Sequence, residues 1–252
     1  MEPILEVRQL TKIFRKNGVP SVTALDHISF QLQPGEVLGI AGESGSGKST
    51  AARVILGLTP PTEGSILLEG QEITALRGRP QREVYRSIQM VFQSPAGSFD
   101  PRRTLGFSIG ESLRNAGMPK SDAKRRVNEL LSQCGLTEDF AARYPHEVSG
   151  GQCQRAAVAR ALAAEPRILI CDEATSALDV TIQKQIMDLL LALKAQHNLS
   201  ILFISHNLAL MQDFCDRILI MKNGRVVETG PTDQLLMNPK NAYTRFLIKS
   251  VL

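Results

Sequence analysis

One stretch constrains the fold of this 252-residue chain more than any other: Gly42-Glu43-Ser44-Gly45-Ser46-Gly47-Lys48-Ser49-Thr50. It fits the pattern G-x-x-x-x-G-K-[ST], a glycine-rich loop whose backbone N–H groups surround the oxygens of a triphosphate. Its glycines allow a positive φ and a close approach of the main chain to an anion. In such a loop Lys48 reaches the β- and γ-phosphates, and the Ser49 hydroxyl binds Mg²⁺.

The segments on either side of this loop agree with that interpretation. Residues 37–41 form an apolar run typical of a buried strand, and residues 49–58 have the pattern of a helix. The positive N-terminal end of that helix would face the phosphates. Because the motif requires a strand, a loop and a helix in this order, the sequence predicts a nucleotide site.

Two carboxylates, Asp172 and Glu173, follow the apolar run of residues 168–171. In parallel sheets, ligands gather at the carboxyl ends of the strands. We therefore expect Asp172 to hold the Mg²⁺ shell and Glu173 to polarise the attacking water.

A second glycine-rich helix start lies at Val148-Ser149-Gly150-Gly151-Gln152. A serine and two glycines at the start of a helix predict a second anion-binding terminus. Taken alone, the same residues favour an ordinary N-cap with Ser149 as the capping residue. Two phosphate-binding helix termini are redundant for a monomer with one site.

The rest of the chain has an α/β pattern. Three short β-rich runs before the phosphate loop predict an antiparallel sheet, at residues 4–7, 21–24 and 28–32. Residues 94–165 lack strand signals, so a helical insertion is predicted there. The helical pattern is clearest at residues 123–133 and 151–164. Strands are then predicted at 167–172 and 200–205, a helix at 180–196, a hairpin turn at Asn223-Gly224, and two short helices at the end.

Composition excludes several classes of protein. A net charge of +4, from 29 basic and 25 acidic residues, is too mild to indicate nucleic-acid binding. The four cysteines show no C-x-x-C spacing, and Cys171 lies in a predicted buried strand, where a small apolar residue is expected. No apolar run approaches the roughly 18 residues of a membrane span. We expect a soluble, cytosolic chain with no targeting segment before Ile4, and a solvated basic surface over residues 77–86.

The ordered motifs resemble those of the ATP-binding cassette (ABC) ATPase family. Ser-Gly-Gly-Gln at 149–152, followed about twenty residues later by Asp172-Glu173, is similar to the family's signature and its following strand. The resemblance implies further roles by position. Phe14 matches the aromatic residue that stacks on adenine, and Gln93 matches the glutamine that senses Mg²⁺ and the attacking water. Residues 176–179, ending at Asp179, match the loop that links two subunits, and His206 matches the histidine at the γ-phosphate.

Motifs and resemblance together imply three sets of site residues. The catalytic set is Lys48, Gln93, Glu173 and His206. The ATP-binding set is Phe14, Gly42, Glu43, Ser44, Gly45, Ser46, Gly47, Lys48, Ser49, Thr50, Ser149, Gly150, Gly151, Gln152 and Asp179. The Mg²⁺-binding set is Ser49, Gln93 and Asp172. In the family two chains pair head to tail and the signature of one closes the site of the other, which explains the second terminus.

The resemblance also implies the fold class: an α/β phosphate-loop NTPase of the ABC ATPase type. We expect a single ABC domain over residues 1–252, with a mixed-sheet core and an antiparallel β part formed by residues 1–93 and 166–230. A helical subdomain is expected at residues 94–165, and a short helical tail at residues 231–252.

A narrower resemblance lies in two segments. Residues 91–104 are similar to the F-Q-x-P-x-x-S-x-x-P-R-x-T run of the peptide/nickel importer branch, although Ser94 replaces a common Asp and Phe99-Asp100 replaces Leu-Asn. Residues 238–244 (NPKNAYT) resemble the tail of that branch as well. The groove around residues 93–104 would receive a short helix from a membrane subunit.

These resemblances imply the ATPase subunit of an ABC importer for oligopeptides, nickel or a metal chelate, with ATP and Mg²⁺ as cofactors. The expected partners are a second, different ATPase subunit rather than an identical one, two transmembrane permease subunits and an extracytoplasmic binding protein, but no nucleic acid. The expected location is the cytoplasmic face of the inner membrane.

Two other functions were weighed against this one. A non-transport ABC ATPase acting on DNA or ribosomes would carry a long coiled coil or a second cassette, and the sequence has neither pattern. A nucleotide-binding scaffold without turnover would lack Lys48, Glu173 or His206, and all three are present.

Overall fold

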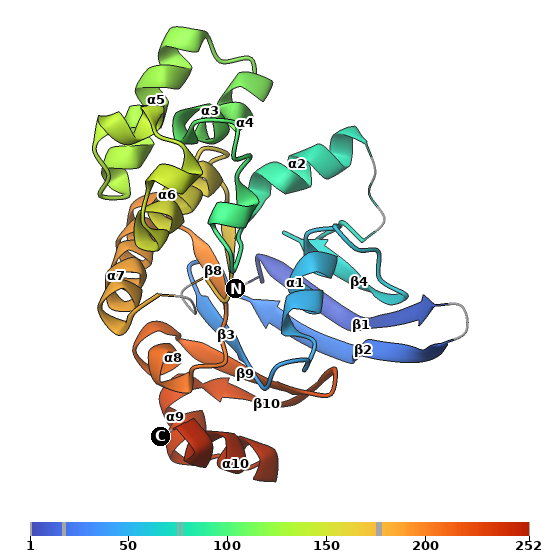
Figure 1. Cartoon of the computed structure of the whole chain (residues 1–252). Helices are drawn as coiled ribbons and strands as arrows, with labels where there is room; N and C mark the ends of the chain where they lie inside the picture. Colours follow the sequence, from blue (N-terminus) through green and yellow to red (C-terminus); the bar gives the residue numbers. More distant parts are fainter. Residues whose placement is uncertain (1, 17–18, 75, 77, 175–177, 252) are drawn as a thin grey trace. The chain divides into compact units, whose positions relative to one another are not determined.

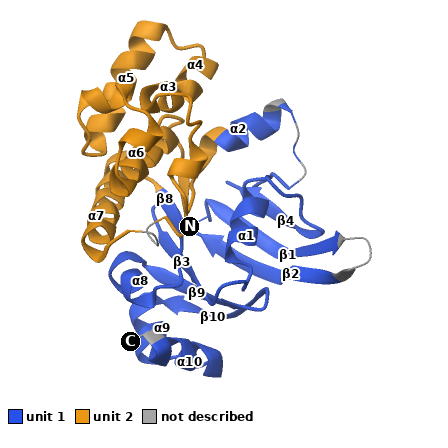
Figure 2. Ribbon diagram, viewed as in Figure 1, with its two compact units in different colours: residues 1–85, 200–252 blue, residues 86–199 orange. Residues whose placement is uncertain are grey.

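The structure is a computed structural model that describes residues 2–16, 19–74, 76, 78–174 and 178–251 (Figure 1). The chain divides into two compact units. Unit 1 comprises residues 1–85 and 200–252, and unit 2 comprises residues 86–199 (Figure 2). The predicted division of the chain at residues 93, 165 and 230 stays a prediction.

Unit 1 contains an antiparallel sheet with the strand order β2-β1-β4-β5. Its strands are β1 (Leu5–Lys16), β2 (Val19–Leu32), β4 (Glu63–Leu68) and β5 (Gln71–Glu72). The three short runs predicted here belong to two long strands. Register shifts in the β1–β2 ladder, and the positive φ of Gln9 and His27, interrupt the apolar alternation without ending the pairing.

Four further strands of unit 1 pair in the order β10-β9-β3-β8. They are β3 (Val37–Ala41), β8 (Ser200–Ile204), β9 (Arg217–Lys222) and β10 (Arg225–Pro231). β3 runs parallel to both β8 and β9, whereas β9 and β10 form the predicted hairpin. Asn223 and Gly224 both have positive φ, at 48° and 78°, as a type I′ turn requires. Every residue of β3 and β8 is buried, which explains their continuous apolar sequences.

Helices complete unit 1. They are α1 (Lys48–Ile55), α8 (Leu208–Phe214), α9 (Thr232–Met237) and α10 (Ala242–Val251). The predicted helix after the phosphate loop and the two predicted helices at the end of the chain are confirmed. α8 was not predicted, and it packs on the sheet through an edge-to-face contact between Phe203 and Phe214, whose ring centroids lie 4.8 Å apart. α2 (Arg79–Ser87), also not predicted, carries the chain from unit 1 into unit 2.

Unit 2 combines a parallel strand pair with helices. The strands are β6 (Ile88–Val91) and β7 (Ile168–Asp172). The α-helices are α3 (Leu105–Ile109), α4 (Glu111–Asn115), α5 (Lys120–Gln133), α6 (Gly150–Leu162) and α7 (Val180–His197). Residues 92–167 are all described and contain helices and turns only, as predicted for the helical insertion.

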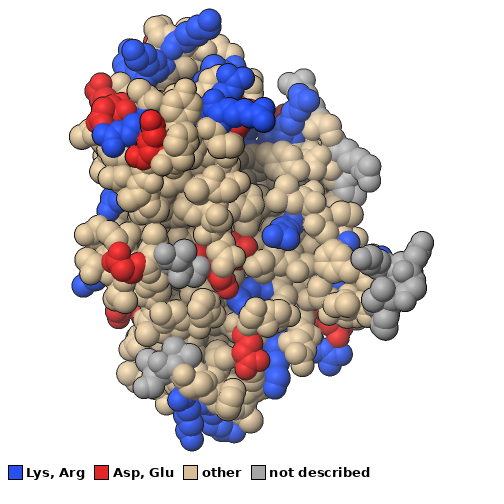
Figure 3. Space-filling model, in the orientation of Figure 1, with Lys and Arg blue, Asp and Glu red and all other residues tan. Residues whose placement is uncertain are grey.

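The charged surface of unit 2 mixes both signs. Arg125 on α5 lies 3.4 Å from Asp122 and 3.9 Å from Glu129, and Figure 3 shows basic and acidic side chains together over this end of the unit. None of the helices in the described ranges combines the length and the apolar content needed to span a bilayer.

Candidate nucleotide site

The predicted phosphate loop, residues 42–47, connects β3 to α1 in a shape that glycine dictates. Gly42 has φ 149° and Gly47 has φ 104°, both outside the range of most side chains. A Cβ on Gly42 would lie 2.2 Å from the carbonyl oxygen of Met221, and one on Gly47 would lie 2.4 Å from that of Ala24. The loop therefore lies in close backbone contact with β9 and β2, and a side chain at position 42 or 47 would deform it.

The Lys48 ammonium lies inside the curve of this loop. Its Nζ donates hydrogen bonds to the carbonyl oxygens of Gly42 and Glu43, each at 2.8 Å, and lies 3.4 Å from Ser46 Oγ. Only 4% of Lys48 is exposed. A buried positive charge and the positive end of α1 therefore act at the same place, which is an arrangement suited to phosphate.

The other residues of the phosphate motif lie around this charge. Ser46 is buried, Ser49 and Thr50 are half-buried, and Glu43, Ser44 and Gly45 are exposed. Two contacts from distant parts of unit 1 hold the loop: Gly224 N donates to Ser46 O at 3.0 Å, and Glu43 N donates to the Tyr243 hydroxyl at 3.3 Å. Sequence reasoning missed both contacts. The sequence did mark the Asn223-Gly224 turn and the tail residues 238–244, but neither pattern indicates which part of the chain these residues contact.

His206 leaves the sheet beside the phosphate loop. β8 pairs with β3 in parallel, with Ile204 opposite Ile40, and Ser205 N donates to Ile40 O at 3.3 Å. Because both strands end at the same edge, the exposed His206 and the loop that starts at Gly42 share that edge. The structure therefore brings His206 to the loop side of unit 1, and its contact with a γ-phosphate stays a prediction.

Phe14 lies on β1 and is 46% exposed, with Lys12 Nζ 5.0 Å from its ring centroid. An exposed aromatic face of this kind suits stacking, but the contacts here are with Lys12. Its role at adenine stays a prediction.

Gln93 and Glu173 meet in unit 2. β6 and β7 run parallel with Val91 opposite Cys171, so both residues follow the strands at one edge. Gln93 Nε2 donates to Glu173 Oε2 at 2.7 Å. Glu173 has φ 46°, which is uncommon for a residue with a side chain. The neighbouring Asp172 is buried, with 6% exposed.

The signature Ser149–Gln152 forms the start of α6. Ser149 is the N-cap: its Oγ accepts the Gln152 N–H at 3.3 Å, and Gln152 Oε1 accepts the Ser149 N–H at 2.9 Å. The N-cap alternative is therefore correct as local structure, and anion binding by this terminus stays a prediction. A Cβ on Gly151 would lie 2.8 Å from Ile182 Cγ2, so the first turns of α6 and α7 are in contact.

Asp179 caps α7 by accepting the Ile182 N–H at 3.0 Å. The signature and Asp179 are thus brought together within unit 2. Ser176 and Ala177, from the loop matched to the subunit link, lie outside the described residues.

Comparisons with known proteins agree with this geometry. The sequence model of the ABC transporter family matches residues 25–176. The chain is 45% identical over 257 residues to the glutathione import ATP-binding protein GsiA of Salmonella paratyphi A, covering 99% of this chain and 41% of that protein. It is also 45% identical over 256 residues to the peptidoglycan transport ATP-binding protein YejF of Agrobacterium fabrum, covering 98% and 47%. The chain thus spans less than half the length of these relatives.

The fold is similar to a solved dimeric structure of the ATP-binding cassette MJ0796 in a post-hydrolysis state with ADP and Pi. The TM-score is 0.83 at 31% identity, with 90% of this chain and 98% of that chain covered. This likeness confirms the predicted fold class, an α/β protein with a mixed sheet, an antiparallel sheet and helices.

Proposed function

The chain belongs to the ABC transporter family of ATP-binding proteins, and from this premise we propose that it is the ATP-hydrolysing subunit of a membrane importer. The observation that carries the ATPase part is Lys48, whose ammonium lies buried inside a glycine-shaped phosphate loop. Import of peptide-like substrates is supported by the names of the relatives, glutathione import and peptidoglycan transport. Nickel and metal chelates remain within the substrate class implied by residues 91–104.

The residues present fit MgATP. The loop at 42–47 is shaped to bring backbone N–H groups close to an anion, and Lys48 adds a positive charge there. Ser49, Gln93 and Asp172 offer the hard oxygen ligands that Mg²⁺ requires. Bound MgATP supplies the phosphoryl group that water accepts.

The chain's own residues then orient the water and neutralise charge. Glu173 is assigned to accept a proton from the attacking water, and Gln93 to align the same water; their 2.7 Å hydrogen bond supports a shared role. Lys48 and His206 act on the β- and γ-phosphates. Asp172 is assigned to the metal because its carboxylate ends the buried strand β7.

We assign the signature Ser149–Gln152 and Asp179 to the site of a second ATPase subunit, paired head to tail with this one. The dimeric MJ0796 structure supports this arrangement. A different second subunit is proposed rather than an identical one. Two permease subunits and an extracytoplasmic binding protein complete the complex, which places this chain at the cytoplasmic face of the inner membrane.

Attachment to the permease is assigned to residues 93–104. Arg102 is exposed in this segment, and Phe107, just beyond it, is 42% exposed with Arg103 4.6 Å from its ring centroid. These side chains offer a basic and aromatic surface to a short helix.

The experiment compares the purified complex of all subunits with the isolated chain. We expect MgATP hydrolysis that rises when the binding protein delivers a peptide substrate. Arg102→Glu should reduce recovery of the permease with this subunit but leave its own MgATP affinity unchanged. Arg125→Glu, a matched charge reversal on the exposed face of α5, should leave both unchanged. Absence of MgATP binding by the wild-type chain would overturn the ATPase proposal, and Arg102→Glu without effect on attachment would overturn the docking assignment.

A further inference from the structure

The phosphate loop and the C-terminal tail of the chain are joined by a hydrogen bond across 200 residues of sequence. The backbone N–H of Glu43, the second residue of the loop, donates to the Tyr243 hydroxyl at 3.3 Å. Tyr243 is 8% exposed, so its ring is packed inside unit 1 and only its hydroxyl end reaches the loop. Burial raises the pKa of Tyr243 further above neutral pH.

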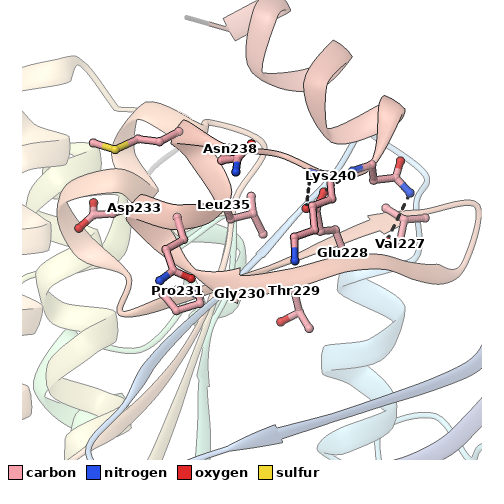
Figure 4. Close-up of a pocket in the computed structure, with 12 residues that line it drawn as sticks. Val227, Glu228, Thr229, Gly230, Pro231, Asp233, Leu235, Asn238 and Lys240 are labelled. Carbon is pink, nitrogen blue, oxygen red and sulfur yellow. Dashed lines mark hydrogen bonds between the residues drawn. The ribbon is translucent and has the colours of Figure 1, made fainter.

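The tail is tied to β10 just before this tyrosine. The Glu228 carboxylate accepts the N–H of Lys240 at 2.8 Å and that of Asn241 at 3.1 Å. Asn241 Nδ2 donates to Val227 O at 3.4 Å, and Asn241 Oδ1 accepts the Tyr243 N–H at 2.8 Å. Figure 4 shows Glu228 and Lys240 facing each other at the wall of a cavity of about 870 Å³ between β10 and α9. These bonds fix the backbone on which Tyr243 stands.

The β9–β10 hairpin contacts the same loop at both of its ends. Gly224 donates its N–H to Ser46 O, and the Met221 carbonyl oxygen lies so close to Gly42 that a Cβ there would be 2.2 Å away. Lys222 Nζ lies 4.4 Å from the centroid of the Tyr243 ring. Hairpin and tail are therefore one assembly that contacts the loop at residues 42, 43 and 46.

We propose that Tyr243 is a positioning residue of the phosphate loop, and that the tail segment 240–244 is coupled through it to the occupation of the loop by nucleotide phosphates. This inference rests on the proposed ATP binding at the loop. By accepting the Glu43 N–H, the Tyr243 hydroxyl fixes the orientation of the peptide group next to Gly42, where the main chain turns toward the phosphates. A loop held in one conformation loses less entropy on binding than a loop that must be ordered by the ligand. Coupling is reciprocal, so bound phosphate must in turn protect the tail.

A purely structural role for Tyr243 predicts different results. If its ring only fills the core, removal of the hydroxyl changes stability and leaves nucleotide affinity unchanged. If the hydroxyl positions the loop, Tyr243→Phe keeps the ring and its contact with Lys222 but weakens phosphate binding. The affinity and the tail's response to nucleotide separate the two roles.

The test measures MgATP affinity and amide hydrogen exchange over residues 238–250 for the full chain, with and without MgATP. For Tyr243→Phe we expect roughly 2- to 10-fold weaker MgATP binding, the range expected for one hydrogen bond. In the wild type MgATP should slow exchange in the tail, and in Tyr243→Phe this slowing should be lost. Tyr85→Phe is the matched control, because it removes a hydroxyl that accepts a 2.8 Å bond from Gln81 on α2; we expect wild-type affinity.

A second variant, Glu228→Gln, tests whether Tyr243→Phe acts only by disturbing the packing of the ring. Glu228→Gln leaves Tyr243 intact but weakens the bonds to Lys240 and Asn241, and it should lower MgATP affinity in the same direction. If both variants bind MgATP like the wild type, or if MgATP leaves tail exchange unchanged, the positioning role is wrong. If the wild type itself binds no MgATP, the failure lies with the proposed function.

Discussion

Helices α1 and α6 both begin at a glycine-rich turn, yet their first turns are built in opposite ways. At α1 the N-cap is Gly47, in a left-handed conformation and without a side-chain capping bond. At α6 the N-cap is Ser149, which exchanges two hydrogen bonds with Gln152 in a capping box. α6 therefore completes its own start from local residues, whereas α1 is held by contacts from distant parts of unit 1.

This difference indicates how each terminus is used. The loop before α1 is fixed by close approaches to Met221 and Ala24, and it holds the Lys48 charge inside. Such a loop is preorganised for an anion by glycines that adopt positive φ without a steric penalty. The start of α6 needs no ligand to be stable, so it can present its glycines on the surface to a phosphate held by another subunit. The comparison thus supports a resident phosphate site at α1 and a donated contact at α6.

Loss of the water-orienting carboxylate should have the largest effect and should separate binding at α1 from chemistry. In Glu173→Gln we expect ATP turnover to fall about 10²- to 10⁴-fold, because the amide keeps the shape but cannot accept a proton. MgATP should still bind, since the loop and Lys48 are untouched. Steady-state hydrolysis and calorimetric binding check the two parts. Glu129→Gln, on the exposed face of α5, is the control and should hydrolyse ATP like the wild type.

The same variant tests α6 as a surface for a second subunit. With its natural partner and MgATP, Glu173→Gln should accumulate as a closed dimer detectable by size. Ser149→Arg added to it should prevent closure, because a bulky cation would block the partner's γ-phosphate, whereas Ser132→Arg on α5 should not. Full-rate hydrolysis by a monomer would contradict the shared site.

Removal of the charge inside the loop should weaken MgATP binding, which Glu173→Gln leaves intact. Lys48→Ala should weaken MgATP binding about 10- to 100-fold, which is the range for the loss of a charge-assisted contact of 1.5–3 kcal/mol. Turnover should be lost, while the far-UV spectrum and unfolding midpoint stay close to the wild type. Lys124→Ala, an exposed lysine on α5, provides the control. ATP turnover at the wild-type rate in Lys48→Ala would contradict the assignment of residues 42–47 as the phosphate loop.

The parts of the site that depend on local sequence were predictable. β3, the loop and α1 follow one another as the motif requires, and the run before Asp172 is the fully buried strand β7. The Asn-Gly turn of the β9–β10 hairpin was predictable for the same reason, because both residues tolerate positive φ. Each of these features is encoded in one continuous stretch of the sequence.

Features that depend on distant contacts were not predictable. The bonds from Gly224 to Ser46 and from Tyr243 to Glu43 join parts of the chain that no local pattern relates. Helix α2 was missed because its residues are mostly polar and, among the side chains described in it, Val84 alone is buried, so no apolar stripe marks it. In β1 and β2, the irregular pairing around Gln9 and His27 interrupts the apolar alternation, so the sequence predicts short runs where the structure has two long strands.

In the isolated chain, loss of the α6 cap should have a moderate effect confined to stability. Ser149→Ala removes the hydroxyl that accepts the Gln152 N–H, which should cost about 1 kcal/mol of unfolding free energy. For a chain of this size that lowers the midpoint by about 2–4 °C. MgATP affinity of the isolated chain should not change, because α6 carries no resident site. Ser121→Ala, in the first turn of α5, is the control for the loss of a serine hydroxyl without a cap.

The smallest effect should come from titrating Glu228, which supports the tail and, through Tyr243, the loop before α1. Burial opposes the charge of Glu228, but the hydrogen-bond donors around it, among them the N–H groups of Lys240 and Asn241, outweigh it and lower its pKa. The contribution of the Glu228 charge to folded-state stability is therefore fully present above the unfolded pKa, about 4.3 for a glutamate. It is lost as the pH falls through the lower, folded pKa.

We expect tail residues 240–250 of the wild type to be better protected from hydrogen exchange than those of Glu228→Gln at pH 7, with the difference vanishing in acid. Protection factors, which correct for the intrinsic pH dependence of exchange, are the measurement. Protection in α6 should be the same in both proteins at every pH, because its capping box is local. A difference in the tail that does not shrink at any acid pH at which the protein stays folded would mean that Glu228 acts through its shape rather than its charge.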